Sequence, residues 1–266
     1  MKIEANGIVM NHELTGDGPY LVLIHGAGDN LNMWYNQVPA FSQRYQVLTY
    51  DVRGFGQTQS SEGEYSMALF AEDLYQLLQA LNIGEVFLLG YSMGGRIALE
   101  LAIQHPKVAK ALVLANSGVG GPRPPQAVER FKAMLQLLQK GDVATIAEEM
   151  TTSAFSPGFK EKNREAFERY KAVKLEVDPQ SFAQAMMALA ADIRPPDVGR
   201  IQCPTLIICG ENDNYTTLDV ARSMQQAIPG SELRVMPTGH AAAIEAPESF
   251  NAAVLEFLSR LVSSGG

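Results

Sequence analysis

The sequence predicts an α/β fold in which a mostly parallel central sheet carries helices on both faces. Along most of the 266 residues, short and continuously apolar segments alternate with segments of helical periodicity. That alternation is typical of parallel strands that are buried on both faces. The composition, 46% hydrophobic and 19% charged, is that of a chain that buries a large core. Chains of this length commonly form one core in this fold class.

Eight strands are expected, and the first two form a hairpin around Asn6-Gly7, because both turn residues tolerate a positive φ. The expected strands are residues 2–5, 8–14, 20–24, 46–50, 86–89, 111–114, 205–209 and 233–236. The expected helices between and after them are residues 66–81, 93–105, 218–227 and 247–261. In the first of these helices, Asp73 is the polar exception on an apolar face that repeats every three or four residues.

The alternation stops between residues 118 and 200, where the pattern is purely helical. Segments rich in glycine and proline, residues 118–125 and 194–197, enclose helices expected at 131–140, 143–150, 160–174 and 179–191. Because α/β proteins bind ligands at the carboxyl edge of the sheet, we expect these helices to form a lid over that edge. The predicted organisation is a core of residues 1–117 and 201–266 with a lid of residues 118–200 inserted between core strands.

The charge and the apolar segments exclude several kinds of partner. Lysine and arginine total 21 against 29 acidic residues, and the net charge of −8 argues against nucleic acid and anionic membrane surfaces. The longest apolar run, residues 185–191, is too short to span a membrane, and the N-terminus lacks a signal-peptide core. Cys203 and Cys209 lie too far apart along one strand to pair. We therefore expect a cytoplasmic chain with reduced thiols.

A candidate nucleophile, Ser92, lies between the strand at 86–89 and the helix that begins directly after it. A serine on so tight a strand-to-helix turn has strained backbone angles, and its neighbours two residues away must be small, as Gly90 and Gly94 are. The helix N-terminus also favours developing negative charge. The pattern predicts a nucleophilic serine; the alternative is a glycine-rich turn with an incidental serine.

Such a serine needs a base, and the chain has four histidines. Only His240, between the last strand and the last helix, is expected at the catalytic edge of the sheet. Asp213 follows the strand at 205–209 and gives the chain order serine, acid, histidine. Glu211 is a nearby rival for the acid, whereas Asn116, after the strand at 111–114, carries no charge to stabilise an imidazolium.

Two backbone N–H groups are expected to bind a developing oxyanion. One belongs to Met93, directly after the candidate nucleophile, and the other to Ala27, in a loop of small residues after the strand at 20–24. An apolar pocket is expected beside them, and ordinary packing is the alternative for each of its residues. The candidates for its lining are Trp34, Phe155, Phe182, Met186 and Leu189.

No cofactor or metal is expected. The glycines at 26 and 28 only partly match a dinucleotide fingerprint, because Leu31 stands where its third glycine belongs. The sequence contains no phosphate-binding GxxxxGK[ST] loop, no HExxH pair and no cluster of cysteine and histidine.

Taken together, these residues resemble the α/β-hydrolase family from Tyr20 to Leu261. Trp34 and the run Asp51-Val52-Arg53-Gly54-Phe55-Gly56 are similar to standard segments of that family. More narrowly, the sequence resembles the branch of 3-oxoadipate enol-lactonases and carboxylesterases. The stretches that carry this likeness are Met33-Trp34, Tyr50-Asp51-Val52-Arg53-Gly54, Tyr91-Ser92-Met93-Gly94-Gly95 and Ile244-Glu245-Ala246-Pro247-Glu248. The resemblance implies the α/β-hydrolase fold and a catalytic triad.

The expected function is a serine hydrolase that cleaves small-molecule carboxylic esters or lactones through an acyl-enzyme, with Ser92, His240 and Asp213 as its triad. Several alternatives stay open: an enol-lactonase proper, a carbon–carbon bond hydrolase and a cofactor-free perhydrolase. A non-enzymatic ligand receptor with an idle triad is a further alternative, since one fold serves several functions. The sequence leaves the oligomeric state undetermined.

Overall fold

The computed structural model describes residues 1–120, 125–191 and 197–262. Its strands form one sheet in the order β1-β2-β4-β3-β5-β6-β7-β8. Within the described sheet, the β1–β2 and β2–β4 pairs are antiparallel and the remaining pairs are parallel. The strands are β1 (Lys2–Ala5), β2 (Ile8–Thr15), β3 (Tyr20–Ile24), β4 (Gln46–Tyr50), β5 (Val86–Tyr91), β6 (Ala109–Ala115), β7 (Thr205–Gly210) and β8 (Glu232–Met236). The predicted α/β fold with a mostly parallel sheet is confirmed.

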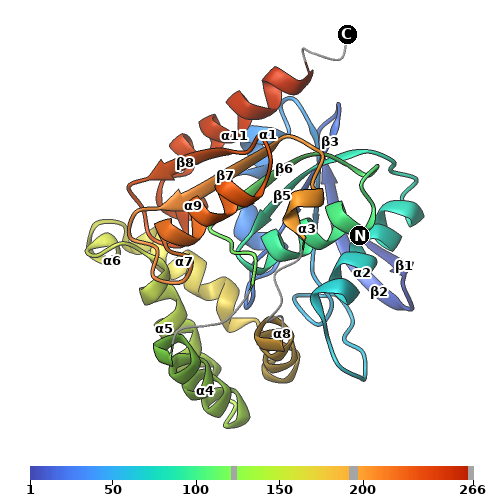
Figure 1. Ribbon diagram of the computed structural model, residues 1–266. Helices are drawn as coiled ribbons and strands as arrows, with labels where there is room; N and C mark the ends of the chain where they lie inside the picture. The colour runs from blue at the N-terminus through green and yellow to red at the C-terminus, as the bar shows by residue number, and fades with distance from the viewer. Residues whose placement is uncertain (121–124, 192–196, 263–266) are drawn as a thin grey trace.

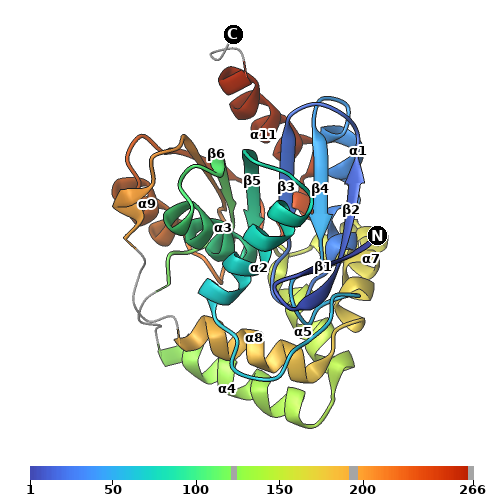
Figure 2. The ribbon, with the colours of Figure 1, turned by 90° about the vertical axis from the view of Figure 1, so that its right-hand side faces the viewer.

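Helices cover both faces of this sheet (Figures 1 and 2). One face carries α2 (Met67–Ala80), α3 (Met93–Gln104) and α9 (Leu218–Ala227), and the other carries α1 (Val38–Phe41) and α11 (Pro247–Val262). Three short helices lie in connections: η1 (Leu31–Trp34), η2 (Val198–Arg200) and α10 (Ala242–Glu245). This layering requires strands that are apolar on both sides.

Alternate residues of one strand enter opposite cores. In β3, Val22 and Ile24 pack with the helices α2 and α3, whereas Leu21 and Leu23 pack with α11. Successive side chains of a strand point to opposite faces, so a sheet covered on both sides needs apolar residues at every position. The continuous apolar runs in the sequence are explained by this arrangement.

The polar exception on α2, Asp73, is bound on two sides within the core. Its side chain is 1% exposed and forms an ion pair with Arg53, whose Nε and Nη2 donate to the carboxylate at 2.7 and 2.5 Å. The amide of Asn6 in the hairpin turn donates to the same carboxylate at 2.7 Å. Because a buried carboxylate without partners is costly, these donors explain how Asp73 is tolerated there.

Before η2, the described residues between β6 and β7 form five α-helices, which gather at one end of the sheet (Figures 1 and 2). They are α4 (Pro125–Gln139), α5 (Val143–Ala154), α6 (Phe159–Lys162), α7 (Arg164–Leu175) and α8 (Pro179–Ala191). Among them α4 packs against α8 and α5 against α7. The expectation of one helix over residues 160–174 is wrong, because Asn163 (φ −137°, ψ 58°) leaves helical geometry and separates α6 from α7. Parts of the glycine- and proline-rich segments, residues 121–124 and 192–196, lie outside the described residues.

Candidate functional site

Ser92 occupies a sharp turn between β5 and α3 with φ 53° and ψ −113°, a backbone conformation that L-residues rarely adopt. A Cβ at Gly90 would overlap the carbonyl of Gly94, and a Cβ at Gly94 would overlap that of Ile24. The small neighbours are therefore a steric requirement of the turn. The serine is half-buried and lies at the N-terminus of α3.

His240 lies in the loop after β8, next to Ser92. Its Nε2 is 3.0 Å from Ser92 Oγ, and its Nδ1 is 2.9 Å from Asp213 Oδ2. A carboxylate can only accept, so Nδ1 carries the proton and Nε2 is the acceptor for the serine hydroxyl. The ring is buried between Tyr91 and Tyr215, with centroid distances of 5.2 and 4.8 Å. This geometry suits proton transfer from the serine to the histidine.

Asp213 is buried at the end of β7 and accepts several hydrogen bonds. Oδ1 accepts from the backbone N–H groups of Tyr215 and Thr216 at 2.8 and 2.9 Å. Oδ2 accepts from Thr216 Oγ1 at 2.6 Å. Burial alone would raise the pKa of this carboxyl, but the nearby His240 and the hydrogen bonds from His240 and Thr216 lower that pKa to about 2. Its rival Glu211 is exposed, whereas the carboxylate next to His240 Nδ1 is that of Asp213.

Asn116, at the end of β6, is a residue of this site whose contribution the sequence did not indicate. It adopts φ 48°, and its Nδ2 donates to Asp213 Oδ2 at 3.0 Å and to the carbonyl of Gly239 at 3.3 Å. The amide therefore supports the aspartate and the loop that carries His240. The signal available in the sequence was that Asn116 directly follows a parallel strand next to the one before Asp213. In the sequence analysis this position was considered only as an alternative place for the acid of the triad.

The two residues expected to bind an oxyanion, Ala27 and Met93, belong to segments that pack closely together, since a Cβ at Gly94 would lie 2.7 Å from the carbonyl oxygen of His25. Met93 is the first residue of α3, where an N–H lacks an intrahelical partner, and Ala27 follows β3. Among the described residues neither N–H forms a hydrogen bond. Both are therefore available to bind an anionic oxygen.

The other three histidines are used elsewhere in the structure. Buried His25 donates through Nδ1 to the Gly26 carbonyl at 2.8 Å and accepts from the Val52 N–H through Nε2 at 2.9 Å. Burial lowers the pKa of its imidazole, which keeps the ring neutral. His12 lies in strand β2, and His105 stacks on Tyr75 beyond the end of α3.

The five expected pocket residues divide between the two cores. Trp34 and Phe155 belong to the core shared with α11, and Phe155 stacks on Phe159 with a centroid distance of 4.2 Å. Phe182 and the half-buried Met186 and Leu189 of α8 pack with the opposite core. Fully buried Phe182 lies against Gly28, where an added Cβ would come within 3.2 Å of its ring, so it touches the loop that contains Ala27.

The described residues contain no group of three or more histidine, cysteine or acidic side chains that could hold a metal ion. Within the same residues, no helix is both long and apolar enough to cross a membrane. Cys203 and Cys209 are both free, and burial raises the pKa of each thiol to about 11. Neither thiol therefore has the low pKa of a reactive cysteine.

The chain is similar to known proteins over most of its length. The family described as "alpha/beta hydrolase fold" matches residues 19–247. The 3-oxoadipate enol-lactonase 2 of Acinetobacter baylyi is 31% identical over 263 residues, which cover 97% of this chain and 96% of that protein.

Two solved structures share the fold over nearly their whole length. The enol-lactonase from Burkholderia xenovorans has a TM-score of 0.91 at 26% identity, covering 97% of this chain and 100% of its own. A thermophilic esterase from Thermogutta terrifontis has a TM-score of 0.89 at 28% identity, with 98% of each chain covered.

Proposed function

The chain belongs to the alpha/beta hydrolase fold family, and from that premise we propose that it is a serine hydrolase of carboxylic esters or lactones. One observation carries the proposal: Ser92, His240 and Asp213 form a continuous hydrogen-bonded chain with links of 3.0 and 2.9 Å. The named activities of the relatives, lactone and ester hydrolysis, point to the same reaction class.

In the proposed reaction, Ser92 Oγ attacks the carbonyl carbon of the substrate while His240 Nε2 takes its proton. Asp213 holds the histidine in the required tautomer and stabilises the imidazolium. The Ala27 and Met93 N–H groups bind the oxyanion. The tetrahedral intermediate collapses when His240 returns the proton to the leaving oxygen, which gives an acyl-enzyme. A water then attacks the acyl carbon while His240 Nε2 takes its proton, and the bond to Ser92 Oγ breaks as His240 returns that proton to Oγ, which releases the acid.

We assign residues 118–200 to a lid and residues 1–117 and 201–266 to the catalytic core. The lid helices contact three loops that follow core strands: Asp29 after β3, Tyr215 after β7 and Gly239 after β8. The last of these loops carries His240, which contacts Ser92, so in this proposal a substrate reaches the serine between the lid and the core. The apolar side chains of α8, such as Phe182 and Met186, favour uncharged acyl or aryl groups there.

Lactones are the second candidate substrates, because the curated relative with 31% identity is an enol-lactonase. In a lactone the leaving oxygen remains attached to the acyl group, so the enzyme releases one product instead of two. The same residues serve both reactions, and the choice depends on the shape of the pocket.

The test is covalent labelling combined with a substrate panel. Wild-type protein is expected to react with a fluorophosphonate at Ser92 and to hydrolyse p-nitrophenyl esters or an enol-lactone. Ser92→Ala should lose both properties while keeping the melting temperature, since only a half-buried hydroxyl is removed. Labelling that persists in Ser92→Ala would assign the nucleophile elsewhere. Tight ligand binding by a wild type that turns over no substrate of the panel would favour a receptor.

A further inference from the structure

A buried ion pair joins helix α7 to the loop that follows β3, outside the proposed triad. Lys174 Nζ donates to Asp29 Oδ1 at 2.6 Å, and the two side chains are only 4% and 1% exposed. The hydroxyl of Tyr170, one turn earlier on α7, donates to Asp29 Oδ2 at 3.3 Å. The proposed mechanism assigns no role to any of these groups.

Asp29 closes the turn that contains Ala27. Its backbone N–H donates to the Gly26 carbonyl at 3.2 Å, and His25 Nδ1 donates to the same carbonyl at 2.8 Å. The Gly26 carbonyl and the Ala27 N–H belong to one trans peptide unit and so point in opposite directions. Holding that carbonyl therefore fixes the direction of the Ala27 N–H.

The Asp29 carboxylate also packs on this peptide directly, because a Cβ on Gly26 would lie 2.9 Å from Asp29 Oδ2. A displacement of the Asp29 side chain would move the turn with it. In addition, an unpaired carboxylate at this place would oppose negative charge developing beside Ala27. Lys174 neutralises that carboxylate, so it acts on the turn both mechanically and electrostatically.

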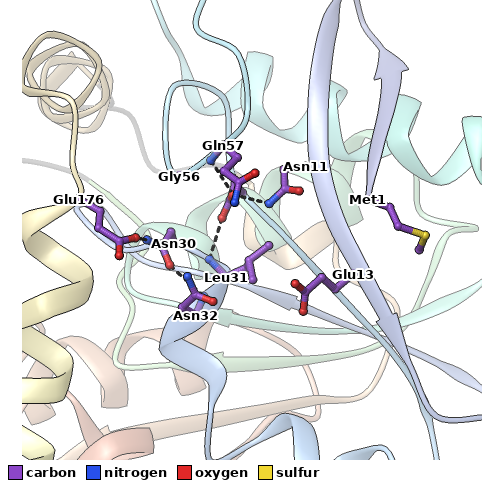
Figure 3. Close-up of a pocket in the computed structure, with 10 residues that line it drawn as sticks. Met1, Asn11, Glu13, Asn30, Leu31, Asn32, Gly56, Gln57 and Glu176 are labelled. Carbon is purple, nitrogen blue, oxygen red and sulfur yellow. Dashed lines mark hydrogen bonds between the residues drawn. The ribbon is translucent and has the colours of Figure 1, made fainter.

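A second contact joins the loop after β3 to the end of α7. Asn30 Nδ2 donates to Glu176 Oε2 at 2.8 Å, directly beyond the last residue of α7. Figure 3 shows these two side chains facing each other among the residues that line a surface pocket. We call Asp29, Asn30, Tyr170, Lys174 and Glu176 the α7 clamp.

We propose that the α7 clamp positions the Ala27 N–H for the oxyanion, with Lys174 and Asp29 as positioning residues. This inference rests on the proposed function. Lys171, one turn earlier on the same helix, pairs with Glu148 of α5 and with Glu168 of α7 itself, and its side chain is more exposed than that of Lys174. Of these two lysines, Lys174 is therefore the one that joins α7 to the loop after β3. A buried pair carries a desolvation cost that exposed pairs avoid. The clamp also implies that the α7 part of the lid stays fixed on the core while a substrate binds.

The experiment compares Lys174→Met with a matched control, Lys171→Met, which removes an ammonium from the same helix. Two quantities are measured: kcat and KM for p-nitrophenyl acetate, and the Kd of phenylboronic acid, which forms a tetrahedral adduct with an active-site serine. Loss of an oxyanion donor costs about 10²- to 10³-fold in kcat, so a displaced donor should cost roughly 10- to 100-fold. We expect that fall in kcat for Lys174→Met, a similar rise in the boronate Kd and a KM within about threefold, because the contact forms in the transition state.

Lys174→Met leaves the Asp29 carboxylate buried and unpaired, which can prevent folding. A second variant without an unpaired buried charge tests the proposal in that case. Asp29→Asn combined with Lys174→Met replaces the pair by neutral groups of similar size, a change that proteins often tolerate. Its kcat and boronate affinity are also expected to fall at least fivefold, since no ammonium holds residue 29.

Two results would overturn the proposed role of the α7 clamp. One is a folded double variant with the kcat and boronate affinity of the wild type, and the other is a Lys171→Met variant whose kcat falls as much as that of Lys174→Met. A wild type that is neither labelled on Ser92 nor active on the substrate panel would instead refute the proposed function. The two failures are therefore distinguishable.

Discussion

Asp213→Asn tests the proposed acid, and the structure shows which way the new amide would turn. The Oδ1 position faces the fixed N–H groups of Tyr215 and Thr216, so an NH₂ group there would meet two donors. The Oδ2 position faces the Thr216 hydroxyl, which can rotate, and the Asn116 amide, which can flip. The NH₂ group should therefore take the Oδ2 position, 2.9 Å from His240 Nδ1.

In that orientation residue 213 donates to His240 Nδ1 and forces the imidazole proton onto Nε2. The histidine then donates toward Ser92 and cannot accept its proton. A wrong tautomer of this kind costs about 10⁴-fold in kcat, or about 5 kcal/mol of transition-state stabilisation. Folding should be kept, because flipped Asn116 would offer its Oδ1, a buried atom that lacks a partner among the described residues, to the new amide.

The assay is kcat for p-nitrophenyl acetate together with the rate of fluorophosphonate labelling, with Glu211→Gln as the matched control. Glu211 is exposed, so its variant should remain within about twofold of the wild type. The reasoning would be refuted by a folded Asp213→Asn variant that retains more than a tenth of wild-type kcat, or by a larger loss in Glu211→Gln.

Two further predictions concern stability and substrate preference. Folding lowers the pKa of Asp213 from 3.8 to about 2, so its stabilising contribution is complete above pH 3.8 and is lost as the pH falls through 2. From pH 5 to pH 2 the wild type should lose about 2 kcal/mol more unfolding free energy than Asp213→Asn, as measured by urea denaturation; equal losses would contradict the shift. Truncating half-buried Met186 to Ala should shift kcat/KM among acetate to octanoate esters toward longer chains, by roughly 1–3 kcal/mol per methylene. An unchanged profile with about 2–5 kcal/mol lost in stability would instead mean that Met186 serves ordinary packing.

The regular elements of the fold were predictable from the sequence because their signals are long or repeated. Continuous apolar runs identified the strands, and the periodicity of segments such as residues 66–81 identified the helices. The four-residue helices η1, α1 and α10 escaped prediction, because one turn is too short to show a period. The break at Asn163 was missed as well, because residues 160–165 are all polar and show no apolar period that an interruption could disturb.

At the candidate site, short sequence signals were enough to predict individual residues. The strained turn at Ser92, the order of acid and histidine, and the few histidines available were enough to select three residues that the structure places in contact. Their catalytic roles stay predictions. The support from Asn116 and the pairing of Asp29 with Lys174 join residues 97 and 145 positions apart, and no local pattern marks such a pair.

The helices α4 to α8 are all inserted between two neighbouring strands of the sheet, β6 and β7. β6 and β7 pair directly, from Leu112 opposite Thr205 to Ala115 opposite Ile208, although the whole helical segment separates them in sequence. The segment thus lengthens one crossover without entering the hydrogen-bond ladder, and the entropic cost of a longer connection grows only logarithmically. Under the proposed function, exchange of that crossover is therefore expected to alter substrate choice, in evolution or in the laboratory, while Ser92, His240 and Asp213 keep their places on the core. A grafted segment must still bring a cation to Asp29, or that aspartate must change with it.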